Sequence, residues 1–183
     1  MLTEKDITHF KDQGFVVLPD LIDPEHIETW NEQFWNHIAA EPNNSASWPD
    51  SYVIEGFSTD PLFGHLPQIK QVVEQLGGNL FAGGGGSMLV HWPRSQGHWN
   101  MPTAGHIDGY GPGGWSGGFM LGATAYLEDV EDGGGAFVYW PQSHLTTHQY
   151  FLENPGHIDG SFTKREDWKD RSWGVFSDLS KQG

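Results

Sequence analysis

The chain has 183 residues, which is enough for one domain with a sizeable core and too few for two such domains. Its 9 basic and 24 acidic residues give a formal net charge of −15, so a nucleic-acid backbone or an anionic membrane is an unfavourable partner. The sequence contains no cysteine, which excludes disulfides, thiolate metal sites and cysteine nucleophiles. We therefore expect one acidic domain over residues 1–183, with no nucleic acid and no membrane among its partners and with its oligomeric state left open.

The composition also bears on location and on fold class. The sequence contains no basic-then-apolar leader and no apolar run of about 18 residues, from which we expect a cytoplasmic protein. Its 25 glycines, 11 prolines and 9 tryptophans are typical of short strands joined by tight turns.

The first residues predict a helix followed by a short strand. Thr3 with an acidic residue three positions later, Asp6, is typical of an N-cap, and Gly14 is typical of the residue that ends a helix. The compact apolar run at residues 15–18 then predicts a strand.

Two further helices are predicted in the first half of the chain. Asp23 and Pro24 predict the start of the second helix, because aspartate favours the N-cap and proline the first turn. Its apolar residues recur at helical spacing and predict a face packed in the core: Ile27, Trp30, Phe34, Trp35 and Ile38. Residues 41–60 predict loops around a short strand at 52–54, and residues 66–76 predict the third helix.

The second half of the sequence predicts β-structure. Strands are expected near residues 87–92, 104–108, 119–127 and 136–140. The glycine-rich segment 131–135 predicts a tight reversal, and the polar tail from residue 145 predicts irregular structure. Helices followed by antiparallel strands indicate an α+β, mainly β chain built around a sandwich or barrel.

Two residues stand out as candidate metal ligands. His106 and Asp108 are separated by one residue, and alternate residues of a strand point to the same face, so the two side chains can converge on one point. One imidazole and one carboxylate are two of the three ligands in the facial triad that holds Fe(II) and leaves positions open for substrate and O₂. The pair by itself is a weak signal, because His-x-Asp occurs by chance in many chains.

The order of motifs around this pair is more specific. Gly105 and Gly109 flank it, and downstream come a predicted strand, an acidic and glycine-rich turn, a second strand and residues 141–144, which read Pro-Gln-Ser-His. Upstream, residues 13–17 read Gln-Gly-Phe-Val-Val and precede a helix that begins with proline. In these features the chain resembles the phytanoyl-CoA dioxygenase family of Fe(II)/2-oxoglutarate-dependent oxygenases over nearly its whole length.

The resemblance implies a double-stranded β-helix (jelly-roll) core with N-terminal helices, Fe(II) and 2-oxoglutarate as cofactors, and O₂-dependent hydroxylation of a small organic substrate. It assigns His106 and Asp108 to the metal and the catalytic centre. His91 and Thr124 lie on strands expected to face the same pocket, where they would contact 2-oxoglutarate. Asp108 favours hydroxylation over halogenation, because halogenating relatives have a small residue at that position.

The same resemblance predicts that the domain is incomplete at its C-terminus. In the family a third metal-binding histidine and an arginine that binds 2-oxoglutarate follow on later strands, and His144 matches neither of them. We expect both residues, and the last strands, beyond residue 183.

Other interpretations stay open from the sequence. His157 is a candidate third ligand, because residues 156–160 repeat residues 105–109 letter for letter as Gly-His-Ile-Asp-Gly. The chain could instead be a non-catalytic or degenerate jelly-roll binding domain that retains a weak divalent-metal site. A third interpretation is a Zn²⁺-dependent hydrolase or isomerase that uses His106, Asp108 and a further histidine.

Overall fold

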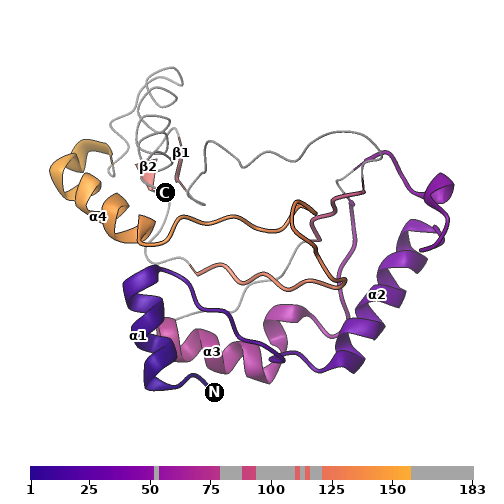
Figure 1. Ribbon diagram of the computed structural model, residues 1–183, viewed down its shortest axis with the longest axis horizontal. Helices are drawn as coiled ribbons and strands as arrows, with labels where there is room; N and C mark the ends of the chain where they lie inside the picture. Colours follow the sequence, from indigo (N-terminus) through magenta and orange to yellow (C-terminus); the bar gives the residue numbers. More distant parts are fainter. Residues whose placement is uncertain (52–53, 79–87, 94–109, 112–113, 116–120, 158–183) are drawn as a thin grey trace. The chain divides into compact units, whose positions relative to one another are not determined.

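The computed structural model describes residues 1–51, 54–78, 88–93, 110–111, 114–115 and 121–157 (Figure 1). The chain divides into two compact units, each built from separate stretches of sequence. Unit 1 comprises Met1–Leu2, Leu18–Trp99 and Ala123–Ala136. Unit 2 comprises Thr3–Val17, Asn100–Gly122 and Phe137–Gly183.

Helices make up most of the regular structure in the described residues. The α-helices are α1 (Glu4–Gln13), α2 (Pro24–Ile38), α3 (Pro67–Gly77) and α4 (Ser143–Glu153). Short 3-10 turns occur at Ser45–Ser47, Phe63–His65 and Pro155–His157. Two-residue strands, β1 (Tyr110–Gly111) and β2 (Gly114–Trp115), pair antiparallel with Tyr110 opposite Trp115.

Helix α1 begins and ends where its sequence predicts. Thr3 is the N-cap: its backbone N–H donates to Asp6 Oδ2 at 2.8 Å, and its hydroxyl accepts from the Asp6 N–H at 3.2 Å. The Thr3 hydroxyl also donates to Asp6 Oδ2 at 2.7 Å. The hydrogen bonds that the carboxylate accepts from the Thr3 N–H and from the Thr3 hydroxyl favour its ionised form and hold the pKa of Asp6 below its ordinary value. Gly14 ends the helix with a φ of 85°, a left-handed conformation that suits glycine.

The core of unit 1 lies between α2 and α3, and both helices confirm the predictions. Trp30 is 1% exposed and packs with Leu66 and Ile69. Its indole N–H donates to the Pro61 carbonyl at 3.0 Å, so the buried polar atom is satisfied. Partly buried apolar residues surround these three: Leu21, Ile22, Ile27, Phe63, Val73 and Leu127.

The start of α2 differs from the prediction in one detail. Asp23 is the N-cap residue, but its side chain makes no capping hydrogen bond. Its carbonyl instead accepts from the backbone N–H groups of His26 at 2.9 Å and Ile27 at 3.4 Å. Pro24 occupies the first turn, where the missing N–H removes no hydrogen bond.

The mainly β, jelly-roll prediction is wrong for the described part of the chain, which is rich in helix. Residues 15–18, 121–127 and 136–140 lie in neither helix nor strand, and among 88–93 only Leu89 forms a single bridge. A strand needs a hydrogen-bonded neighbour as well as a β-prone sequence. Val17 is 70% exposed and Phe137 65%, so each of these segments leaves one large apolar side chain open to solvent. The predicted strand at 104–108 lies outside the described residues.

The prediction of irregular structure from residue 145 is wrong as far as residue 153, because α4 begins at Ser143 and continues to Glu153. The rest of the predicted tail, residues 158–183, lies outside the described residues. The amino-terminal half of α4 contains threonines and histidines, which have modest helix propensity and hid the helical pattern. Phe151 is buried, and the Gln149 side chain donates to Glu153 at 2.7 Å, a helical i,i+4 pair. Local side-chain pairing and one buried aromatic residue therefore stabilise this helix.

Candidate functional site

The residues that carry the predicted metal site lie outside the described part of the chain. This holds for His106 and Asp108 and for the side chain of the alternative ligand His157. The backbone of His157 ends the 3-10 turn Pro155–His157. Among the residues that are described, no three His, Asp or Glu side chains gather closely enough to hold a metal ion.

His91, one of the two predicted 2-oxoglutarate contacts, packs against the glycine-rich turn. A Cβ added to Gly135 would lie 3.1 Å from both Cβ and Cγ of His91, and Gly135 has a φ of 92°. The predicted reversal is present, with the Gly134 N–H donating to the Glu131 carbonyl at 2.8 Å. Glycine is needed at Gly135 for both reasons, conformation and space, and the His91 ring stays exposed beside it.

Thr124, the other predicted contact, is an exposed residue of segment 121–127, which lies in neither helix nor strand. The strand that was expected to direct it toward a pocket does not form. No hydrogen bond between described residues joins Thr124 to His91, although both belong to unit 1. Both side chains are exposed, and their contact with 2-oxoglutarate stays a prediction.

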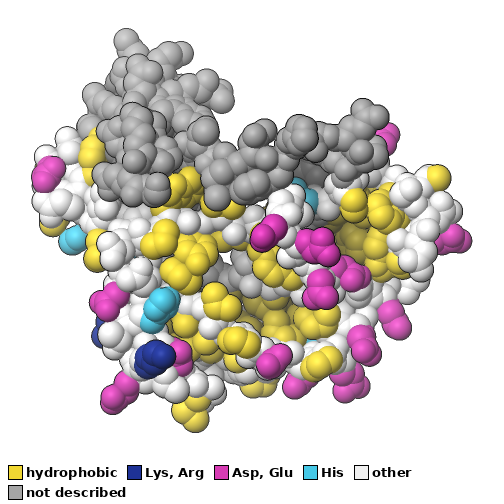
Figure 2. Space-filling view, in the orientation of Figure 1, with side chains coloured by type: hydrophobic (Ala, Val, Ile, Leu, Met, Phe, Trp, Pro, Cys, Tyr) yellow, Lys and Arg dark blue, Asp and Glu magenta, His cyan; other side chains and the backbone are white. Residues whose placement is uncertain are grey.

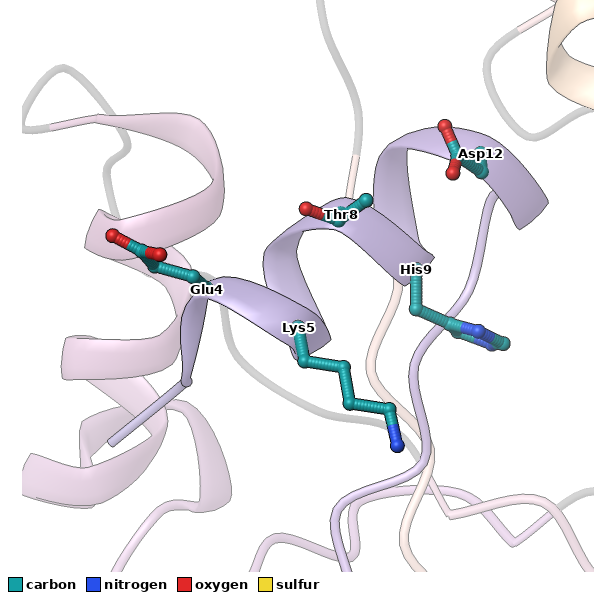
Figure 3. A pocket seen from close by; sticks show the side chains of 5 residues that line it. All are labelled: Glu4, Lys5, Thr8, His9 and Asp12. Carbon is teal, nitrogen blue, oxygen red and sulfur yellow. The ribbon is translucent and has the colours of Figure 1, made fainter.

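The hollow drawn in Figure 3 is a shallow depression of about 380 Å³ on helix α1. Five polar or charged residues line it: Glu4, Lys5, Thr8, His9 and Asp12. All five belong to one helix, and their side chains diverge from the ribbon rather than converge on a common point (Figure 3). Such a surface presents mixed charges to water and offers no convergent donor set.

The motif at residues 141–144 has a different role from the strand ending that the resemblance suggested. Gln142 and Ser143 begin α4, and His144 lies in its first turn. The Nε2 atom of His144 lies 2.8 Å from the Lys11 carbonyl oxygen at the end of α1. The hydrogen bond thus connects the end of α1 with the Pro-Gln-Ser-His motif, two parts of unit 2 that are far apart in the sequence.

Sequence analysis also missed an aromatic cluster in unit 1. The rings of Trp48 and Trp92 stack with centroids 5.0 Å apart, and Trp35 lies 5.8 Å from the first and 6.0 Å from the second. The N–H groups of Trp48 and Trp92 donate to the carbonyls of Glu41 and Ser51, whereas the buried Trp35 Nε1 has no partner among the described residues. Because positions 35, 48 and 92 follow no period, no sequence signal could have joined them.

The charge of the described surface matches the composition. Aspartate and glutamate side chains are spread over the face drawn in Figure 2, where lysine and arginine are rare. A net charge of −15 attracts divalent cations and repels anionic ligands, most strongly at low salt. Of the described helices, none has both the length and the apolar composition needed to cross a bilayer.

Comparison with known proteins identifies no family. Neither the models of known protein families, nor the curated proteins, nor the solved structures contain a match to this chain.

Proposed function

We propose that the chain is an Fe(II)/2-oxoglutarate-dependent oxygenase that hydroxylates a small organic substrate. The observation that carries this proposal is the segment Gly-His-Ile-Asp-Gly at residues 105–109, followed by the acidic and glycine-rich turn and the Pro-Gln-Ser-His motif. His106 and Asp108 supply two of the metal ligands in the proposal. This order of motifs resembles the phytanoyl-CoA dioxygenase family.

The donor set suits the metal. One neutral imidazole and one carboxylate bind Fe(II) and leave coordination positions for co-substrate, substrate and O₂. When bound, Fe(II) with 2-oxoglutarate and O₂ would supply the hydroxylation of a C–H bond: one oxygen atom of O₂ enters the substrate, the other enters succinate, and CO₂ is released. The side chains of His106 and Asp108 hold the metal, and Gly105 and Gly109 leave room for close approach of the backbone.

A third ligand is needed for tight binding, because two ligands hold a divalent ion more weakly than three. The described residues supply no such group of three. His157 is the candidate within the chain, since it repeats the sequence context of His106. The net charge of −15 supports cation binding and opposes the dianion 2-oxoglutarate, so the co-substrate depends on the bound metal for its affinity.

The first test is anaerobic calorimetric titration with Mn(II), a redox-silent substitute for Fe(II), in the presence and absence of 2-oxoglutarate. The proposal predicts saturable binding at one site that becomes tighter when 2-oxoglutarate is added. Binding that 2-oxoglutarate leaves unchanged would contradict the oxygenase assignment. It would favour the alternative, a non-catalytic binding domain with a weak divalent-metal site.

The repeated pentapeptide provides a matched control. Asp108→Ala should weaken Mn(II) binding by at least about tenfold, since a ligand matters at least as much as the groups that orient it. Asp159→Ala makes the same change in the second copy, at residues 156–160, and should leave the affinity within about twofold if that copy holds no metal. Loss of binding in Asp159→Ala alone would move the site to the second copy.

A further inference from the structure

The carboxyl end of α1 is completed by a segment far along the chain. The last four carbonyls of a helix lack partners within the helix and need donors from elsewhere. In α1 the Lys11 carbonyl accepts from His144 Nε2 at 2.8 Å, across a separation of 133 residues. The Gln13 carbonyl accepts from the Gln142 backbone N–H at 2.9 Å, and the Phe10 carbonyl from the Gly14 N–H at 2.8 Å.

The contact between His144 and α1 determines which ring nitrogen of His144 is protonated and restricts position 14 to glycine. A carbonyl oxygen only accepts, so Nε2 of His144 must carry the proton. The ring lies directly against Gly14, where an added Cβ would be 2.5 Å from His144 Nδ1. A side chain at Gly14 and the observed position of the ring are therefore incompatible.

Gln142 makes backbone hydrogen bonds with both α1 and α4. Its N–H binds the end of α1, while its carbonyl accepts from the N–H groups of Leu145 at 3.0 Å and Thr146 at 3.3 Å in the first turn of α4. It does so with a φ of 64°, a left-handed conformation that is unfavourable for a residue with a side chain. Such strain persists only where the surrounding contacts hold it.

Aromatic contacts add to the hydrogen bonds between the end of α1 and residues 139–144. The rings of Phe15 and Tyr139 have centroids 4.0 Å apart, and Phe15 also meets His9 of α1 edge-on at 5.0 Å. Residues 139–144 thus follow the end of α1 from Phe15 back to Lys11, and Figure 1 shows the carboxyl end of α1 beside the first turn of α4. All of these residues belong to unit 2.

We propose that residues 139–144 form a strap, a conformational device that locks the last turn of α1 to the first turn of α4 so that the two turns open together. The strain at Gln142 favours the open state, and the bonds to Lys11 and Gln13 favour the closed state. Gln142 binds α1 through its N–H and α4 through its carbonyl, and its strained backbone positions both groups. Relaxation of that strain would move both groups and so release the two turns together. Opening would release the carboxyl end of α1 from the first turn of α4.

Amide hydrogen exchange on the full chain tests the strap. His144→Phe keeps a ring over Gly14 and removes the donor, so exchange in the last turn of α1 and the first turn of α4 should rise together by about fivefold, the effect of one net hydrogen bond. His144→Gln keeps an N–H donor and should stay nearer to the wild type. Exchange in α3, which belongs to unit 1, should not change in either variant.

Three results would overturn the strap: a rise confined to α1, a rise confined to α4, or no difference between the two substitutions. A parallel rise in α3 would show general destabilisation and would also count against the strap.

The variant Gln142→Gly gives an independent test that does not depend on removing a contact. Glycine relieves the strain at φ 64° without removing the backbone hydrogen bonds, so exchange in both turns should slow. Exchange that speeds up in this variant would contradict the proposed balance.

Discussion

The contact between Gly14 and His144 makes a quantitative prediction for Gly14→Ala. Two costs arise in this variant. The left-handed backbone at φ 85° costs an alanine roughly 1–2 kcal/mol, partly offset by about 0.4–1 kcal/mol of lost freedom in the unfolded chain. The new Cβ, 2.5 Å from His144 Nδ1, must also displace the ring and break its bond to Lys11, which costs about 1 kcal/mol more. We therefore expect a loss of about 2 kcal/mol in the free energy of unfolding.

Gly56→Ala provides the matched control for the backbone term. Gly56 has a φ of 70°, and an added Cβ there would lie 4.0 Å from His37, an ordinary contact. Its cost should be limited to the conformational term, about 1 kcal/mol or less. The difference between the two variants then measures the displacement of His144.

The measurement is urea unfolding followed by far-UV circular dichroism, for both alanine variants in the wild-type and His144→Ala backgrounds. Removing the ring should lower the cost of Gly14→Ala by about 1 kcal/mol and leave the cost of Gly56→Ala unchanged. Two results would refute the predicted clash between a side chain at Gly14 and the His144 ring. One is an equal loss of unfolding free energy in the two glycine variants, and the other is a loss in Gly14→Ala that does not depend on His144.

Three further outcomes are expected. Asp6→Ala should destabilise the protein at neutral pH. Because the pKa of Asp6 is lowered in the folded state, its contribution to stability is present above the unfolded pKa of about 3.9 and is lost as the pH falls through the folded value. The thermal unfolding temperatures of variant and wild type should therefore converge in acid. A difference that persists in acid would contradict the role of the carboxylate. Trp30→Ala should cost about 3–5 kcal/mol, because the ring is 1% exposed, whereas Leu145→Ala at a 51% exposed position should cost under about 0.5 kcal/mol in urea unfolding. Raising the salt from about 0.1 M to about 1 M shortens the Debye length from about 10 Å to about 3 Å, so calorimetry should show weaker Mn(II) binding; an unchanged affinity would mean that the net charge of −15 does not assist it.

The proposed metal ligands and the hydrogen bonds of the strap belong to different residues, so the two proposals can fail separately. Metal binding depends on His106 and Asp108, whereas the strap depends on His144 and Gln142. His144→Phe should therefore change amide exchange in α1 and α4 without changing the Mn(II) titration. A loss of Mn(II) binding in that variant would show that the Pro-Gln-Ser-His motif takes part in the metal site instead.

Local signals in the sequence predicted three of the described helices closely. The Thr3–Asp6 capping box, Gly14 and the proline-initiated start of α2 act within one or two turns of their own positions, so they can be recognised without knowledge of the fold. The reversal at 131–135 belongs to the same class, because its hydrogen bond joins residues three apart. The helical spacing of Trp30 and Phe34 likewise predicted the buried face of α2.

The errors arose where the structure depends on partners far along the chain. β-Prone residues at 15–18 and 136–140 predicted strands, but strand formation is decided by a hydrogen-bonded neighbour that the sequence does not name. Helix α4 lacked a clear periodic signal and was missed. The candidate ligands His106 and Asp108 were selected by spacing and resemblance, and they lie outside the described residues, so their assignment remains a prediction.

By itself, the sequence determined the acidic character of the chain, the bounds of α1, the start of α2, the extent of α3 to within one residue at each end, and the tight turn at 131–135. Each of these follows from composition or from interactions between near neighbours. Only the tertiary structure decided that His144 caps α1 across 133 residues, that Trp35, Trp48 and Trp92 meet, and that the β-prone residues 15–18 and 136–140 lie in neither helix nor strand. The physical reason is the same in each case. Long-range contacts form when the favourable free energy of burial and hydrogen bonding exceeds the entropic cost of closing a long loop. That balance depends on all the contacts of the fold and not on the residues of one segment.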